Sequence, residues 1–150
     1  MREFNFTSTK CGMKKTLDKY NKRIYSNLDL SKKEDIMQDC IFCKIIRGEA
    51  KSWKIYEDDF TYVFLDINPV NEYHTLVIPK KHFENIFDIT EDEFQHLSKT
   101  IKRIVNLYNV KLGMKNVQII NSSGAEAQQD VFHIHFHIVP RYKGDNQDVK

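Results

Sequence analysis

Three histidines near the C-terminus alternate with large apolar residues, in the run Val131-Phe132-His133-Ile134-His135-Phe136-His137-Ile138-Val139. Successive side chains of a β-strand point to opposite faces, so a strand over this run places the three histidines on one face. The other face would carry Phe132, Ile134, Phe136 and Ile138. Imidazole can act as a nucleophile, a proton carrier or a metal ligand near neutral pH. A strand face that happens to be rich in histidine is the alternative, but half of the chain's six histidines fall within five residues.

A second chemical pattern is the C-x-x-C formed by Cys40 and Cys43, which supplies two thiolates at chelating distance. No second closely spaced pair follows, so the fold would have to supply any further ligands. The alternatives are a redox pair, which no surrounding βαβ pattern supports, and two buried cysteines without a ligand. The total of three cysteines favours a reducing compartment over a disulfide framework.

Length and composition bound the class of protein. The chain has 150 residues, the length of one domain with a substantial core. Its formal net charge of +2 gives no reason to expect a bulk nucleic-acid partner. No apolar run approaches membrane-spanning length, and the N-terminus lacks the apolar core of a signal peptide. We expect a cytoplasmic protein with no membrane partner.

The elements that must position these residues follow from periodicity and from helix and turn signals. A long helix begins at Thr90, with Glu93 completing a capping box, and ends at Gly113. Its apolar stripe consists of Phe94, Leu97, Ile101, Ile104 and Tyr108. A short helix is predicted over residues 41–47, and strands over 54–56, 61–65, 75–78, 116–120 and the triad itself. One long helix and one short helix on a mainly antiparallel sheet make an α+β domain.

Residues 1–37 differ from the rest of the chain and are rich in Lys, Asn, Asp and Ser. We interpret them as an N-terminal extension of unknown role, and residues 38–150 as the domain that carries the histidine and cysteine motifs. A short amphipathic helix is predicted in the extension from the spacing of Leu17, Tyr20, Ile24 and Tyr25. Cys11 lies in this extension and is expected to be a free thiol.

The histidine run, together with several other short motifs, resembles the histidine triad (HIT) family of nucleotide hydrolases and transferases. The other motifs are Cys40–Glu49, Phe64–Pro69, His74–His82, Asn121 and Gln129–Phe132. Their order and spacing match the family over about residues 38–145. The resemblance is to the branch that hydrolyses purine nucleoside phosphoramidates, in its zinc-carrying microbial form, and it implies a HIT-like fold.

The resemblance implies that His135 is a nucleophile that attacks the α-phosphate of a nucleotide and forms a nucleotidyl-histidine, which water then cleaves. His137 would hydrogen-bond the phosphate or leaving group and hold a partner imidazole, for which His74 is the candidate. Without the resemblance, His74 would be interpreted as an ordinary residue at a strand end.

Phosphate contacts are expected from Asn121, Gln129, Asp130 and the backbone of the loop over residues 121–130, although such a loop is equally typical of a plain connection. A serine at the position of Asp130 could protonate the leaving group directly, whereas Asp130 would need to be protonated or to act through water. Gln128 and Tyr73 each replace a glycine that is usual in the family.

The resemblance assigns the ribose hydroxyls to Asp66 and the base to Phe42, Ile45 and Ile67. The alternatives are an ordinary turn residue for Asp66, which precedes Ile67-Asn68-Pro69, and core packing for the three apolar side chains.

The zinc-carrying members of the family use ligands at the positions of Cys40, Cys43, His82 and His133. A Cys₂His₂ set leaves no coordination position for water, so such a zinc would be structural. The family also pairs its subunits through the long helix and the neighbouring strand, which implies a homodimer with Val105 and Val110 as candidate contacts.

The expected function is that of a HIT-type hydrolase resembling an adenosine 5′-monophosphoramidase, with a purine nucleotide as substrate and an AMP-like product. One alternative is a dinucleoside polyphosphate hydrolase, since Arg141 and the Gly144-Asp145 pair would suit either branch. Another is a nucleotide-binding regulator with little turnover. The uridylyl-transferase branch is disfavoured because it places a proline where this chain has Ile134.

Overall fold

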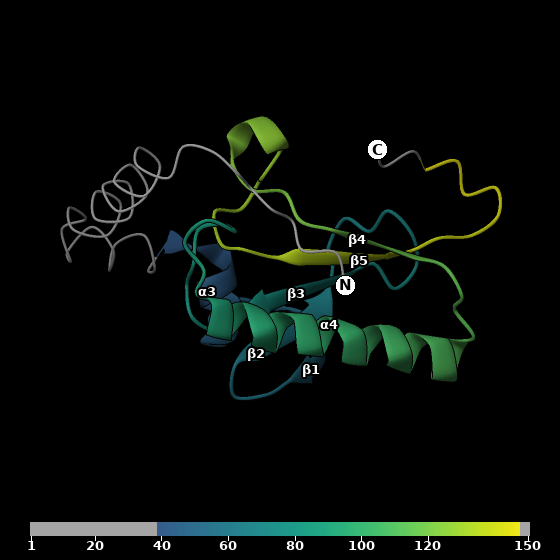
Figure 1. Ribbon diagram of the computed structural model, residues 1–150, viewed down its shortest axis with the longest axis horizontal. Helices are drawn as coiled ribbons and strands as arrows, with labels where there is room; N and C mark the ends of the chain where they lie inside the picture. The colour runs from purple at the N-terminus through teal and green to yellow at the C-terminus, as the bar shows by residue number, and fades with distance from the viewer. Residues whose placement is uncertain (1–38, 148–150) are drawn as a thin grey trace, which may run out of the picture. The chain divides into compact units, whose positions relative to one another are not determined.

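The computed structural model describes residues 39–147, so the helix predicted around Leu17–Tyr25 lies outside the described residues. The described elements are α3 (Ile41–Ile46), β1 (Lys54–Glu57), β2 (Thr61–Leu65), β3 (Thr75–Pro79), α4 (Glu91–Leu112), β4 (Val117–Ile120), the 3₁₀ turn η1 (Ala125–Ala127) and β5 (Phe136–Pro140). The five strands form one antiparallel sheet in the order β1-β2-β3-β5-β4 (Figure 1). The predicted α+β class is confirmed.

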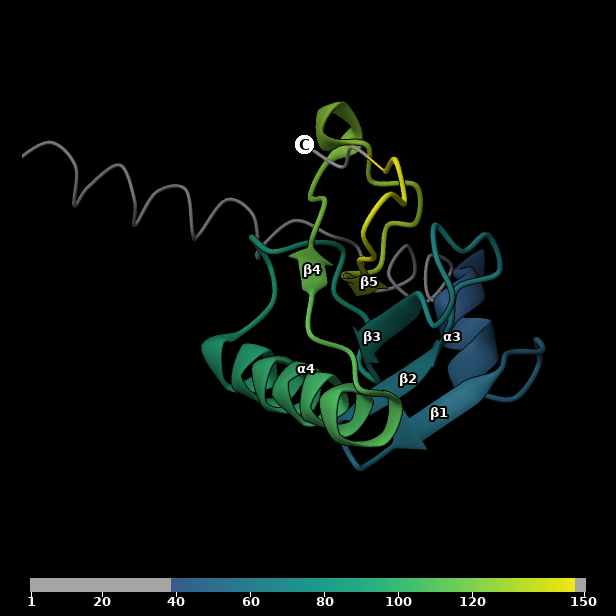
Figure 2. The same ribbon diagram turned by 90° about the vertical axis from the view of Figure 1, so that its right-hand side faces the viewer.

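The two helices cover opposite faces of the sheet (Figure 2). Alternation along the strands explains why, because Val63 and Val77 pack with α4 while Phe64 and Leu76 pack with α3. On the α4 side the core contains the predicted stripe residues Leu97, Ile101, Ile104 and Tyr108. Phe94, the first residue of the predicted stripe, lies at the edge and contacts the ring of Phe136.

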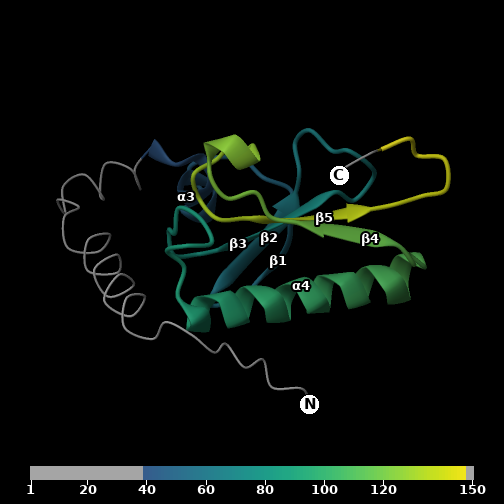
Figure 3. The same cartoon turned by 45° about the horizontal axis from the view of Figure 1, so that its top comes forward.

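The ends of α4 are those that the sequence predicts. The Thr90 side chain accepts a hydrogen bond from the backbone N–H of Glu93 at 3.3 Å, and Gly113 ends the helix in the left-handed conformation at φ 67°. The carboxylate of Glu93 is paired with Lys81, which ties the start of α4 to the segment after β3. In Figure 3 the helix runs along one face of the sheet below β4 and β5.

The prediction of one regular strand through the whole histidine run is wrong. Strand β5 begins only at Phe136, so His133 and His135 precede it. The N–H of His133 bonds back to the carbonyl of Val131 at 2.8 Å, and Ile134 N–H bonds to Phe83 at 2.7 Å. This tight turn breaks the alternation of a strand, and Phe132 is exposed instead of packing on an apolar face.

Two of the non-glycine residues with positive φ are those that replace glycines of the family pattern. Tyr73 and Gln128 both have φ 63°. A left-handed conformation costs a non-glycine residue roughly 1–2 kcal/mol, so the fold at these two positions suits glycine better than the residues present. Both positions border segments that carry site residues, His74 and the loop 121–130.

Candidate active site

A cavity of about 350 Å³ opens on the α3 side of the sheet. The end of β2, the residues after η1 and the histidine run all contribute to it, through Asp66, Asp130, His135 and His137 among others. The volume lies within the range of small-molecule sites. Its lining residues come from segments that are far apart in the sequence, from α3 to β5.

The side chain of His135 is buried and its tautomer is fixed by the backbone. Its Nδ1 lies 2.8 Å from the carbonyl oxygen of His133. A carbonyl can only accept, so Nδ1 carries the proton and Nε2 keeps its lone pair. Burial lowers the pKa of His135, which keeps the ring neutral. The amide of Asn121 donates to the carbonyl of His135 at 2.8 Å and so fixes the backbone that carries this ring.

A backbone N–H group fixes the tautomers of His74 and His137. The N–H of Val70 donates to His74 Nδ1 at 3.1 Å, so the proton of neutral His74 sits on Nε2. That Nε2 lies 2.9 Å from His137 Nδ1, which must therefore accept. The N–H of His137 is left on Nε2, available to a ligand in the cavity. Burial, followed by the charges of His135 and His74, lowers the pKa of His137 to about 4.

Asp66 lies beside this pair of rings. Its Oδ1 accepts from the N–H of Asn68 at 2.8 Å, in the turn that follows β2. Its Oδ2 lies 3.5 Å from His74 Nε2 and 3.7 Å from His137 Nδ1. The carboxylate also lines the cavity, so one oxygen is used by the turn while the other faces the imidazoles and the space for a ligand.

The loop 121–130 is braced by its own side chains. Gln129 is buried; its side-chain oxygen accepts from Gly124 N–H at 2.7 Å, and its amide donates to the carbonyls of Glu84 and Val131. Asn121 accepts from Ser123 in addition to holding His135. Of the three predicted phosphate-binding residues, Asp130 lines the described cavity, whereas Asn121 and Gln129 position the backbone around it.

The three residues predicted to contact the base differ in how much of their surface is exposed to the cavity. Phe42 and Ile45 are buried in the core on the α3 side, and the Phe42 ring meets the His135 ring edge-on at a centroid distance of 5.3 Å. Ile67 lines the cavity with 77 % of its surface exposed. Sequence reasoning missed Trp53, which also lines the cavity; the only signal was a lone tryptophan just before a predicted strand.

The four predicted metal ligands lie together, with their ligand atoms all within 4.8 Å of one another. His133 Nδ1 lies 3.5 Å from the sulfurs of both Cys40 and Cys43, and His82 Nδ1 lies 3.3 Å from Cys43. Tetrahedral zinc with ordinary bond lengths separates sulfur and nitrogen ligands by roughly 3.6 Å. His133 Nε2 donates to the carbonyl of Pro79 at 3.0 Å, so its Nδ1 lone pair points at the cysteines, as ligation requires.

The cysteine pair also has the electrostatics of a metal site. Burial raises the pKa of Cys40, but its contacts with His133 and His82 outweigh burial, and the net pKa is lowered. Burial and the neighbouring Cys40 thiolate raise the pKa of Cys43. The Cys40 thiolate therefore forms readily, and its negative charge disfavours deprotonation of Cys43. A divalent cation between the two sulfurs would remove this repulsion and favour both thiolates.

Asp66, His74 and His137 form a second group of potential ligand atoms. The hydrogen bonds argue against a metal there. Because Val70 N–H occupies His74 Nδ1, His74 Nε2 carries a proton and has no lone pair to give. The short contact between the two imidazoles is a hydrogen bond through which His74 fixes the orientation of the His137 ring.

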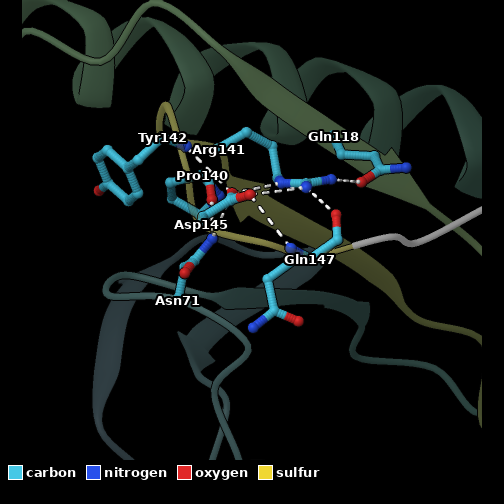
Figure 4. Close-up of polar contacts among 7 residues, drawn as sticks. All are labelled: Asn71, Gln118, Pro140, Arg141, Tyr142, Asp145 and Gln147. Carbon is cyan, nitrogen blue, oxygen red and sulfur yellow. Dashed lines mark hydrogen bonds and ion pairs between the residues drawn. The ribbon is translucent and has the colours of Figure 1, made fainter.

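The segment after β5 is tied to the loop that carries His74. Arg141 forms two hydrogen bonds to Asp145, through Nε at 2.7 Å and Nη2 at 3.0 Å, and a third to Gln118 (Figure 4). Asn71 donates to Asp145 Oδ2 at 3.0 Å and to the carbonyl of Pro140 at 2.8 Å. The carbonyl of Asn71 accepts from His74 N–H at 3.1 Å. Arg141 and Asp145 thus brace the site from outside the cavity.

A cavity edged by paired imidazoles, on a five-stranded antiparallel sheet with one long helix, defines the class of histidine triad proteins. The family model described as HIT domain matches residues 47–144, and the chain belongs to this family. An uncharacterised HIT-like protein of Methanocaldococcus jannaschii is 49 % identical over 111 residues, which cover 74 % of this chain and 85 % of that protein.

Two further relatives bear on the chemistry. The adenosine 5′-monophosphoramidase HNT1 of Candida albicans is 38 % identical over 108 residues, covering 68 % of this chain and 70 % of that protein. A zinc-bound histidine triad family protein from Mycobacterium smegmatis has a crystal structure that matches with a TM-score of 0.71 at 36 % identity, covering 76 % of this chain and 83 % of that one. Family membership supports nucleotide hydrolysis in general. Within residues 39–147, no helix is long and apolar enough to cross a membrane.

Proposed function

We propose that this protein hydrolyses purine nucleoside 5′-phosphoramidates through a nucleotidyl intermediate on His135. The observation that carries the proposal is the geometry of the buried, neutral His135. Its Nδ1–H is held by the His133 carbonyl, which leaves the lone pair on Nε2, and its side chain lines the cavity. A neutral imidazole held in one tautomer is ready to attack phosphorus without first losing a proton.

In the first step, His135 Nε2 attacks the α-phosphorus, and the phosphorus–nitrogen bond to the amine leaving group breaks. The amine departs with the bonding electron pair and takes a proton from water held by the cavity-lining Asp130. The Nε2–H of His137 donates to a non-bridging phosphate oxygen, where negative charge gathers in the transition state. His74 holds that donor in place through its own Nε2–H.

In the second step, water attacks the phosphorus, the bond to His135 Nε2 breaks, and the electron pair returns to the imidazole. The proton that this water releases neutralises the hydroxide left beside Asp130 in the first step, so Asp130 ends the cycle as it began. Asp66 Oδ2, the oxygen that the turn does not use, accepts from the ribose hydroxyls, which holds the α-phosphate in line with His135 through both steps.

We also propose that Cys40, Cys43, His82 and His133 hold one zinc ion; the structure of the Mycobacterium smegmatis protein is that of a zinc-bound histidine triad protein. When bound, the zinc supplies structure, because four protein ligands leave no coordination position for water. It would fix His133, whose carbonyl holds the His135 tautomer.

A homodimer is proposed through α4 and β4. Strand β4 stands at the end of the sheet order, and Val110 on α4 is exposed with Ile119 on β4. Val105, the other candidate, packs partly against the core and offers less surface.

The test is turnover of adenosine 5′-phosphoramidate with acid-quenched mass spectrometry of the protein. The wild type should release AMP and show a transient mass increase of one adenylyl group. His135→Ala should lose both while still binding AMP. A variant that keeps more than about a few per cent of wild-type turnover would show that His135 is not the nucleophile. A diadenosine polyphosphate in parallel separates the two hydrolase branches, and AMP binding without turnover of either would indicate a regulator.

A further inference from the structure

Two of the three residues that were expected to contact a base, Phe42 and Ile45, line the cavity but expose little surface to it. Phe42 and Ile45 belong to the buried cluster on the α3 side, and the Phe42 ring already meets the rings of Phe64, His133 and His135. A base bound in the cavity must therefore find most of its apolar contact on side chains that still expose surface.

The cavity lining contains such side chains. Trp53 exposes 64 % of its surface, Ile67 exposes 77 %, and Ile41 is also exposed. Exposed apolar side chains that gather around one concave cavity are typical of a ligand-binding site, unlike a single exposed aromatic residue elsewhere on the surface. The uncovered apolar surface lies on the residues that line the same cavity as His135 and His137.

The backbone of Trp53 is fixed close to the expected ribose site. Its carbonyl accepts a hydrogen bond from Leu65 N–H at 3.0 Å, which extends the pairing of β1 with β2. Leu65 immediately precedes Asp66. A nucleoside whose ribose is held by Asp66 therefore has its base within reach of the residues opposite the end of β2.

We propose that Trp53 is the specificity-determining residue of this site and that, with Ile67, it forms the apolar wall on which a purine base stacks. The proposal rests on the proposed nucleotide-binding function of the cavity. An indole offers the largest π face of any side chain, and base–aromatic stacking is sequence-tolerant but favours the larger ring system. Purine nucleotides should consequently be preferred over pyrimidine nucleotides.

Trp53 is the single tryptophan of the 150 residues, so the chain carries its own probe. Titration of the full-length protein with AMP should change the tryptophan emission with the same dissociation constant that calorimetry gives. Ribose 5-phosphate, which has no base, should leave the emission unchanged. The matched control is Phe87→Ala, which removes another exposed aromatic side chain, 80 % exposed and outside the cavity lining, and should leave AMP affinity and emission unchanged.

Trp53→Ala should weaken AMP binding about tenfold or more, and Trp53→Phe should restore most of the loss because it keeps an aromatic face. With adenosine phosphoramidate, Trp53→Ala should raise KM and leave kcat nearly unchanged, since stacking is the same in the ground and transition states. The preference for adenosine over uridine phosphoramidate should narrow in the same variant.

The outcomes separate this proposal from the proposed function. Suppose that turnover is intact. If AMP then leaves the tryptophan emission unchanged, or if Trp53→Ala retains the wild-type KM and base preference, the role of Trp53 alone is overturned. AMP binding that changes the emission without any turnover supports Trp53 and overturns the hydrolase. No binding of AMP by calorimetry overturns both.

Discussion

Acid should destabilise this fold through His137, and the size of the effect follows from its burial. Burial and the neighbouring imidazoles lower the pKa of His137 from 6.5 to about 4. Between these two values the unfolded chain binds a proton that the folded protein does not. The free energy of unfolding must therefore fall as the pH falls. The contribution of His137 is present above the unfolded pKa and is lost as the pH drops through the folded one.

The magnitude is about 3 kcal/mol between pH 7 and about 4, because each pKa unit corresponds to about 1.4 kcal/mol. This is a large part of the stability of a small domain. Burial also lowers the pKa of His74, so the measured loss in the wild type should be larger than the part due to His137.

The assay is urea unfolding of the wild type and of His137→Gln at both ends of this pH range. The glutamine variant has no group to titrate at this position, so it should lose about 3 kcal/mol less than the wild type. Both proteins keep the same Cys₂His₂ cluster, so its acid response cancels in the comparison. Equal losses in the two proteins would refute the reasoning that burial holds His137 neutral.

Three other perturbations address separate parts of the site. Asp66→Ala should weaken binding of AMP more than that of its 2′,3′-dideoxy analogue, by roughly 1.5–3 kcal/mol in calorimetry; equal losses would place Asp66 away from the ribose. Zinc should be found at one per chain, and Cys43→Ser should lower the melting temperature as chelation does; absence of metal with an unchanged melting temperature would leave the cysteines as packing residues. The protein should sediment as a dimer at micromolar concentration and Val110→Glu as a monomer, whereas a monomeric wild type would contradict the proposed contact.

The positions of the secondary structure elements were predictable because their signals are local. Thr90 and Gly113 bound α4 through side-chain and backbone preferences that act within a few residues. The C-x-x-C of Cys40 and Cys43 was visible in the sequence, but His82 and His133 were expected beside it only from the resemblance to the family; the four ligand atoms do lie within 4.8 Å of one another. The regular strand through His133 and His135 was not correctly predicted, because a contact with Phe83 outweighs the local preference for alternation.

The sequence by itself determined which imidazoles, thiols and carboxylates this protein has, and where the long helix that supports them begins and ends. Only the tertiary structure decided what each one can do. A donor from the backbone of Val70 puts the proton of His74 on Nε2, and carbonyl acceptors leave a lone pair on His135 Nε2 and on His133 Nδ1. The partner of His137 is 63 residues away in the chain. The tautomer of each histidine and the exposure of each side chain depend on neighbours that are distant in the sequence. Residue spacing alone therefore does not predict them.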